Sequence, residues 1–128
     1  MPHLILEYTD NIEPFAVQPL LAKLHEEMVA TGAVNLKGLK SRAICHADYH
    51  IGDGDESYAF VHVQMWIRDG RSHKTKQEMA QRAMTILEQT FGHRRQNGYL
   101  SLSVDIQELA KGIALTHHNI PENAKRKT

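Results

Sequence analysis

The sequence predicts an α+β two-layer fold, in which two helices cover one face of a four-stranded sheet. Two segments with helical periodicity are each flanked by strand-like segments, so a strand–helix–strand unit occurs twice along the 128 residues. Glycines mark matching places in both units: the end of the helix, the start of the second strand and the end of that strand. They form three pairs with a common spacing of 60 residues: Gly32 with Gly92, Gly38 with Gly98, and Gly52 with Gly112. We therefore expect one domain over residues 1–128, with pseudo-repeats at about 2–54 and 58–114.

The first unit is expected to place its helix between strands at 3–8 and 40–47. Asn11 is suited to the N-cap of this helix, Pro14 to its first turn, and Gly32 to the position that follows its last turn. Apolar residues recur at helical spacing in between: Phe15, Leu20, Leu21, Leu24 and Met28.

The second unit is expected to place its helix between strands at 58–68 and 99–107, with Ser72 as the cap and Gly92 as the end. Both strands alternate in side-chain character, and each helix crosses over between strands that run parallel. A generic ferredoxin-like sandwich has a similar order of elements, and the pattern alone does not separate the two. The apolar helix positions are Met79, Ala83, Ile86, Leu87 and Phe91.

The second face of such a sheet has no helix to cover it. Phe60, Trp66 and Tyr99 alternate onto that face among polar side chains. A half-apolar uncovered face of this size favours an oligomer over a monomer.

Composition excludes several classes of function. The 15 basic residues equal the 15 acidic ones and the pI is about 7.1, which argues against a nucleic-acid binder and against recruitment to anionic lipid. No apolar run approaches the ~20 residues that cross a bilayer. Cys45 is the single cysteine, and no secretory signal is visible, so a cytoplasmic protein is expected. The nine histidines lack the spacing of a metal cage, so no metal is expected.

Pro2 is a candidate general base. Removal of Met1 would leave Pro2 with a free secondary amine, fixed in place by the strand that it begins. Burial and nearby cations lower the pKa of an amine toward neutrality, where it is an effective base. The alternative is that Met-Pro marks only a tolerated second residue.

Several stretches together resemble the 5-carboxymethyl-2-hydroxymuconate isomerases of the tautomerase superfamily. The similarity extends in order from Pro2 to about residue 120, and no single motif is decisive. The stretches are 2–11 (PHLILEYTDN), 38–42 (GLKSR), 58–62 (YAFVH), 70–72 (GRS), 100–109 (LSLSVDIQEL) and 117–120 (HHNI).

This resemblance implies both a fold and a reaction. Members of the family look like two fused copies of the small 4-oxalocrotonate tautomerase βαβ unit and assemble as homotrimers with their sheets inward. They shift a proton along a carboxymethyl-hydroxymuconate-type dienol acid from homoprotocatechuate degradation, without a cofactor or metal. By this likeness Pro2 is the general base, and the partner is a small unsaturated polycarboxylate.

The resemblance also implies substrate-binding residues. Arg71 matches a family arginine, which would bind a substrate carboxylate, although it also fits a solvated turn residue. Lys40 replaces a family arginine, and Arg42 shares its strand face and matches the family. Lys40 also fits a strand-edge charge without a role. Tyr49 would line the pocket and exclude water from Pro2. Alternatively, it is an ordinary aromatic residue beside a turn.

Two other functions remain open from the sequence. Lysine at position 40 fits a tautomerase for another unsaturated 2-oxo acid. A non-catalytic trimeric binding module on the same scaffold belongs to a different class.

Overall fold

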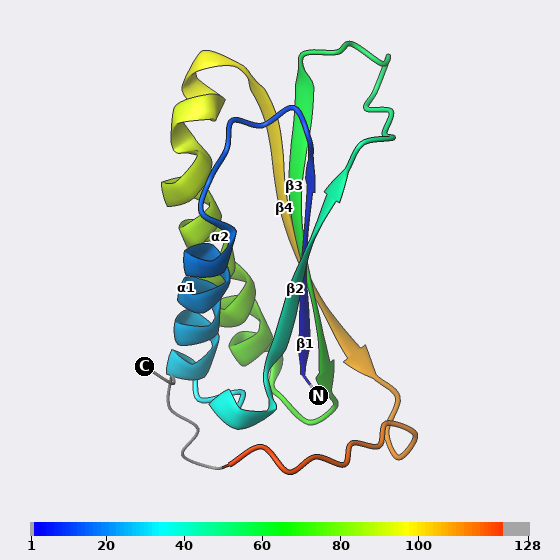
Figure 1. Ribbon diagram of the computed structural model, residues 1–128. Helices are drawn as coiled ribbons and strands as arrows, with labels where there is room; N and C mark the ends of the chain where they lie inside the picture. The colour runs from blue at the N-terminus through cyan, green and yellow to red at the C-terminus, as the bar shows by residue number, and fades with distance from the viewer. Residues whose placement is uncertain (1, 122–128) are drawn as a thin grey trace.

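The protein folds as a mixed four-stranded sheet with two helices on one face. The computed structural model describes residues 2–121, apart from the side chains of 95–97. Figure 1 shows both helices on the same side of the sheet. The elements in chain order are β1 (His3–Thr9), α1 (Val17–Ala30), the short 3-10 helix η1 (Leu36–Gly38), β2 (Lys40–His46), β3 (Tyr58–Arg68), α2 (His73–Asn97) and β4 (Tyr99–Leu109).

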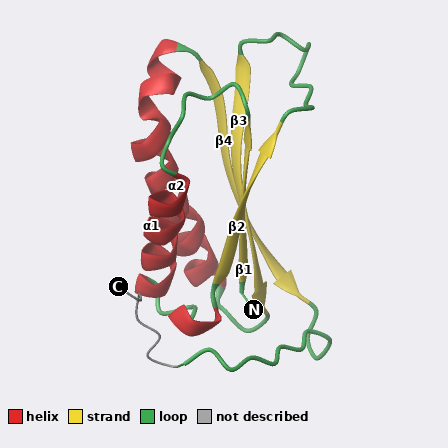
Figure 2. Cartoon of the chain, viewed as in Figure 1, coloured by secondary structure: helices red, strands yellow, loops and turns green. Residues whose placement is uncertain are grey.

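The strand order β2-β1-β3-β4 contains two parallel pairs. β1 is parallel to β2 and β3 is parallel to β4, while β1 and β3 join the two pairs in antiparallel fashion. In a ferredoxin-like sandwich the βαβ units are split, whereas here the two strands of each unit are direct neighbours. The expected α+β two-layer fold is therefore confirmed, with two βαβ units in one sheet (Figure 2).

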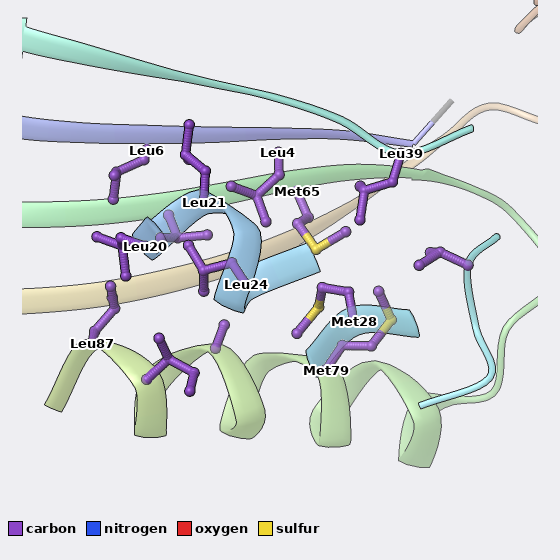
Figure 3. Packing of buried hydrophobic residues seen from close by; sticks show 14 of the residues in the cluster. Leu4, Leu6, Leu20, Leu21, Leu24, Met28, Leu39, Met65, Met79 and Leu87 are labelled. Atoms are coloured by element: carbon purple, nitrogen blue, oxygen red, sulfur yellow. The ribbon is translucent and has the colours of Figure 1, made fainter. Parts of the chain in front are cut away.

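The core lies between the sheet and the helices. Alternate residues of β1 and β3 point toward the helices, because successive side chains in a strand face opposite sides. Each fully buried apolar side chain of this kind stabilises the fold by about 1.5–3 kcal/mol. Figure 3 shows the centre of this cluster, where the core contains Leu4, Leu6, Leu20, Leu21, Leu24, Met28, Leu39, Met65, Met79 and Leu87.

The predicted start of the first helix is wrong. α1 begins at Val17, and its N-cap Ala16 makes no side-chain hydrogen bond. Asn11 lies outside the helix, where its Nδ2 donates to the carbonyl oxygen of Tyr58 at 2.6 Å. Pro14 also precedes the helix, and Pro19 occupies its first turn instead. The side chain of Asn11 is thus used to join the β1–α1 loop to the start of β3.

The predicted end of the second helix is also wrong, although both Ser72 and Gly32 behave as expected. Ser72 Oγ accepts from the backbone N–H of Thr75 at 3.1 Å and caps α2. Gly32 follows α1 with φ +77°, a conformation that glycine adopts without strain. Gly92 lies within α2, which continues to Asn97.

The part of α2 that continues beyond Gly92 is held by contacts with distant parts of the chain. Arg94 donates through Nη1 to the carbonyl oxygen of Asn11 at 3.1 Å and through Nη2 to that of Ser57 at 3.2 Å. These bonds fix the helix beyond Gly92 to the loop before α1 and to the start of β3.

Candidate active site

Pro2 lies buried at the start of the central strand β1. Its carbonyl oxygen accepts a hydrogen bond from the backbone N–H of Lys40 at 3.2 Å, so the first residue of β2 holds the beginning of β1 in place. β3 lies on the other side of β1, where His3 faces Trp66. The position of the Pro2 nitrogen is therefore set by the sheet, and does not depend on a side-chain rotamer.

A cluster of basic side chains occupies the same end of the sheet, on the face without helices. We call Lys40, Arg42 and His3 the basic cluster. The parallel register places His3 opposite Lys40, and Arg42 lies two residues further along the same face. Arg42 donates from Nη1 to Nδ1 of His3 at 3.2 Å, and Lys40 Nζ donates to the carbonyl oxygen of Gly38 at 3.1 Å.

The surroundings of His3 favour the neutral form of its imidazole. Burial lowers the pKa of His3, and the positive charges of Arg42 and Lys40 lower it further. A neutral ring can accept the proton of Arg42 at Nδ1, whereas an imidazolium cannot.

Arg71 lies in the turn between β3 and α2, at the same end of the sheet as Pro2 but on the side of the helices. Its Nε and Nη2 both donate to the carbonyl oxygen of Ala33, at 3.0 and 2.6 Å, and Nη1 donates to that of Arg68 at 3.2 Å. These bonds join the loop after α1 to the turn before α2. The guanidinium carries more N–H groups than they use, so it retains donors for an anion.

A pocket of about 410 Å³ opens beside Arg71. The capped N-terminus of α2 contributes to it, and the N-terminal end of a helix favours negative charge. Pro2 is not among its lining residues, which are Thr31, Gly32, Ala33, Asp69, Gly70, Arg71, Ser72 and Thr75.

The structure does not bring Tyr49 to Pro2 within one chain. The hydroxyl of Tyr49 donates to Oδ1 of Asp10 at 3.4 Å, and Asp10 follows the last residue of β1. Pro2 precedes the first residue of the same strand, so it lies about 26 Å from Asp10 at the rise of about 3.3 Å per residue of a strand. Tyr49 can therefore wall the Pro2 site only if it comes from another subunit.

Two features of this end of the sheet are not among the sequence-based predictions. His3 directly follows Pro2, and strand alternation was enough to place it on the face of Lys40. The contact of Arg71 with Ala33 had no such signal, because the two residues meet only through the packing of separate loops.

Residues 2–121 hold neither a metal cage nor a membrane-spanning helix. Within them, no three His, Cys, Asp or Glu side chains are grouped so as to hold a metal ion. No described helix combines the length and the apolar character that a membrane span needs.

Known structures of other proteins share this fold. A fused 4-OT described as a wild-type symmetric trimer matches with a TM-score of 0.66 at 18% identity, over 85% of this chain and 86% of that one. A macrophage migration inhibitory factor-like protein from Entamoeba histolytica matches with a TM-score of 0.65 at 12% identity, over 91% and 96% of the two chains. The fold is that of the tautomerase superfamily.

Closer similarity identifies the family. A family model described as 5-carboxymethyl-2-hydroxymuconate isomerase matches residues 2–124, and the chain belongs to this family of isomerases. The 5-carboxymethyl-2-hydroxymuconate Delta-isomerase of Escherichia coli is 32% identical over 121 residues, which are 94% of this chain and 96% of the relative. A 5-carboxymethyl-2-hydroxymuconate isomerase from Deinococcus radiodurans R1 matches with a TM-score of 0.88 at 33% identity, over 93% of this chain and 90% of that one. The resemblance noted in the sequence is confirmed.

Proposed function

We propose that the protein is a cofactor-independent isomerase that moves a proton within a carboxymethyl-hydroxymuconate-type dienol acid, with the nitrogen of Pro2 as general base. The family match supports the reaction class. The observation that carries the assignment of the base is the buried position of Pro2, with its carbonyl bonded to Lys40 and its nitrogen at the start of β1. The proposal requires that Met1 be removed.

In this reaction the neutral amine takes a proton from one end of the conjugated system. The amine becomes an ammonium group, and the electron pair left on the substrate spreads toward a carboxylate. The same proton then returns to another carbon, so the enzyme ends unchanged and a double bond has moved. Burial favours the neutral amine at the outset, because the protonated form is poorly solvated there.

Positive side chains would stabilise the charge that develops on the substrate. Lys40, Arg42 and Arg71 are the cations that we assign to substrate carboxylates. Strand alternation places Pro2 on the face of Leu4, toward the helices, whereas Lys40 and Arg42 emerge on the opposite face. A complete site would therefore combine Pro2 and Arg71 of one subunit with the basic cluster, and with Tyr49, of its neighbours.

Such sharing of residues fits a homotrimer. The face of the sheet opposite the helices carries Phe60 and Trp66 only half-buried. Subunits that pack through this face would cover these rings and bring the basic cluster of one chain toward another. We propose three sites per trimer, with one Pro2 in each.

A second substrate class is favoured by Lys40. An ammonium group is a point charge without the planar fork that binds a carboxylate through two hydrogen bonds. The same base could therefore serve a smaller unsaturated 2-oxo acid with fewer carboxylates.

The test is an ultraviolet assay against a panel of enol mono-, di- and triacids. The protein should first be shown by mass spectrometry to begin at Pro2. Pro2→Ala should lose about 10²- to 10⁴-fold in kcat, the usual contribution of a general base. Pro14→Ala, an exposed proline outside the helices, is the matched control and should keep full activity. Undiminished turnover by Pro2→Ala would exclude Pro2 as the base. If the wild type that begins at Pro2 turned over no member of the panel, the proposed isomerase activity would be refuted in favour of a non-catalytic binding module.

A further inference from the structure

The arginine of the basic cluster is held by an uncharged partner. Arg42 Nη1 donates to His3 Nδ1 at 3.2 Å, and no described carboxylate lies within ion-pair distance of Arg42. Elsewhere in the molecule arginines meet acids: Arg82 pairs with Glu27 and Glu78. A carboxylate in the place of His3 would neutralise Arg42 and compete with an anionic ligand. A neutral ring fixes the guanidinium and leaves its charge available.

We infer that His3 is a positioning residue of the isomerase site, which orients the guanidinium of Arg42 toward a substrate carboxylate while leaving its positive charge uncompensated. This inference rests on the proposed function, because it assigns Arg42 to the substrate. His3 directly follows Pro2 in sequence, but the Pro2 that serves the same site would come from a neighbouring subunit.

The register of the sheet makes this contact specific. His3 lies opposite Lys40 on β2, and Arg42 is its diagonal neighbour on the same face. The Arg42 side chain can therefore reach back along the strand to Nδ1 of His3. Because the guanidinium is always a donor, Nδ1 must carry no proton, and the ring hydrogen lies on Nε2.

The charges around His3 explain why the neutral ring persists. Lys40 and Arg42 face it from β2, and Trp66 and Gln64, both uncharged, face it from β3. The amine of Pro2 is the adjacent titratable group on β1. Burial and the two cations hold the pKa of His3 below its ordinary value. Protonation at acid pH would remove the acceptor and repel Arg42.

The first experiment compares two variants of His3 by steady-state kinetics. His3→Leu removes the acceptor and should raise KM about ten-fold with little change in kcat, as expected when one hydrogen bond to a charged group is lost. His3→Asn retains an acceptor oxygen near the position of Nδ1 and should restore KM to within a few-fold of the wild type. His93→Leu is the matched control, since His93 is an exposed residue of α2, away from the open face of the sheet; its KM should not change.

A double-mutant comparison isolates the contact with Arg42. Arg42→Ala should raise KM by itself, and adding His3→Leu should then have no further effect. The wild-type KM should rise only as the pH falls through the lowered pKa of His3, which lies below the ordinary histidine value of about 6.5, and His3→Asn should lack this rise. An equal effect of His3→Leu with and without Arg42 would overturn the inference, as would an unchanged KM in His3→Leu.

A measurement independent of turnover separates this inference from the proposed function. Nitrogen-15 NMR of the imidazole at pH 7.5 should show a proton on Nε2 and none on Nδ1 of His3. The opposite tautomer, or a doubly protonated ring, would contradict the positioning role even in an active enzyme. An inactive protein with the expected tautomer would instead refute the proposed function and leave the contact itself intact.

Discussion

The cations that we assign to substrate carboxylates are each held by uncharged acceptors in the described part of the chain. Arg71 binds the carbonyl oxygens of Ala33 and Arg68, and Lys40 binds that of Gly38. A carbonyl fixes the direction of a cation without cancelling its charge, in contrast to a carboxylate. A site for a polyanion needs both properties, because its ligands must be ordered before the substrate arrives and still attract it.

Replacement of Arg71 should therefore affect both stability and catalysis. Arg71→Ala leaves the half-buried carbonyl of Ala33 without its donors, and the free energy of unfolding should fall by about 1–3 kcal/mol. kcat/KM should also fall, because a ligand for the substrate is lost. Chemical denaturation and the ultraviolet assay measure the two effects. Arg68→Ala is the control, since that exposed side chain is a neighbour in sequence and its backbone carbonyl is unchanged; equal behaviour of the two variants would show that the Arg71 bonds contribute nothing.

Secondary-structure elements were easier to predict than their ends. Period-two alternation placed β3 and β4 correctly, since each strand buries one face and the signal is local. The start of α1 and the end of α2 were missed, because Asn11 and Arg94 bond to partners 47 and 83 residues away. Prediction of helix caps from sequence assumes that such side chains bond to the nearby helix end. Here they bond to distant parts of the chain instead.

The uncapped start of α1 offers a direct way to stabilise the protein. Ala16 has the extended conformation of an N-cap, with φ −80° and ψ 103°, and it is exposed. Ala16→Asp should accept a hydrogen bond from the first turn and raise the free energy of unfolding by about 0.5–1 kcal/mol. Ala22→Asp, at an exposed position in the middle of the same helix, should instead lower it. Urea denaturation of both variants measures these changes. A loss of stability in Ala16→Asp would show that the missing cap does not limit the stability of the first turn of α1.

At the scale of the whole molecule, the sequence predicted the two-unit sheet and the uncovered face, and it placed Pro2 at a strand start. It could not predict which candidates meet. Pro2, Lys40 and Arg71 gather at one end of the sheet, whereas Tyr49 lies at the other end of β1. That outcome depends on the direction of each strand within the assembled sheet. In the proposed trimer, one chain would therefore build only part of the site, and neighbouring subunits would complete it.

The proposed trimer has a measurable signature. Analytical ultracentrifugation should give a mass about three times that of the 14.5 kDa chain. Trp66→Glu places a charge on the open face, and should dissociate the particle and abolish turnover together. Gln77→Glu adds the same charge to an exposed position of α2 and should change neither. An active monomer in the Trp66 variant would refute a site shared between subunits.

Pro2 directly precedes β1, so in the proposed mechanism the removal of Met1 would decide when activity starts. A peptide fused ahead of Pro2 converts its amine into an amide, and an amide nitrogen is not basic enough to take the proton in the proposed mechanism. Such a fusion would be a latent form, and a protease that cuts directly before Pro2 would switch it on at a chosen moment.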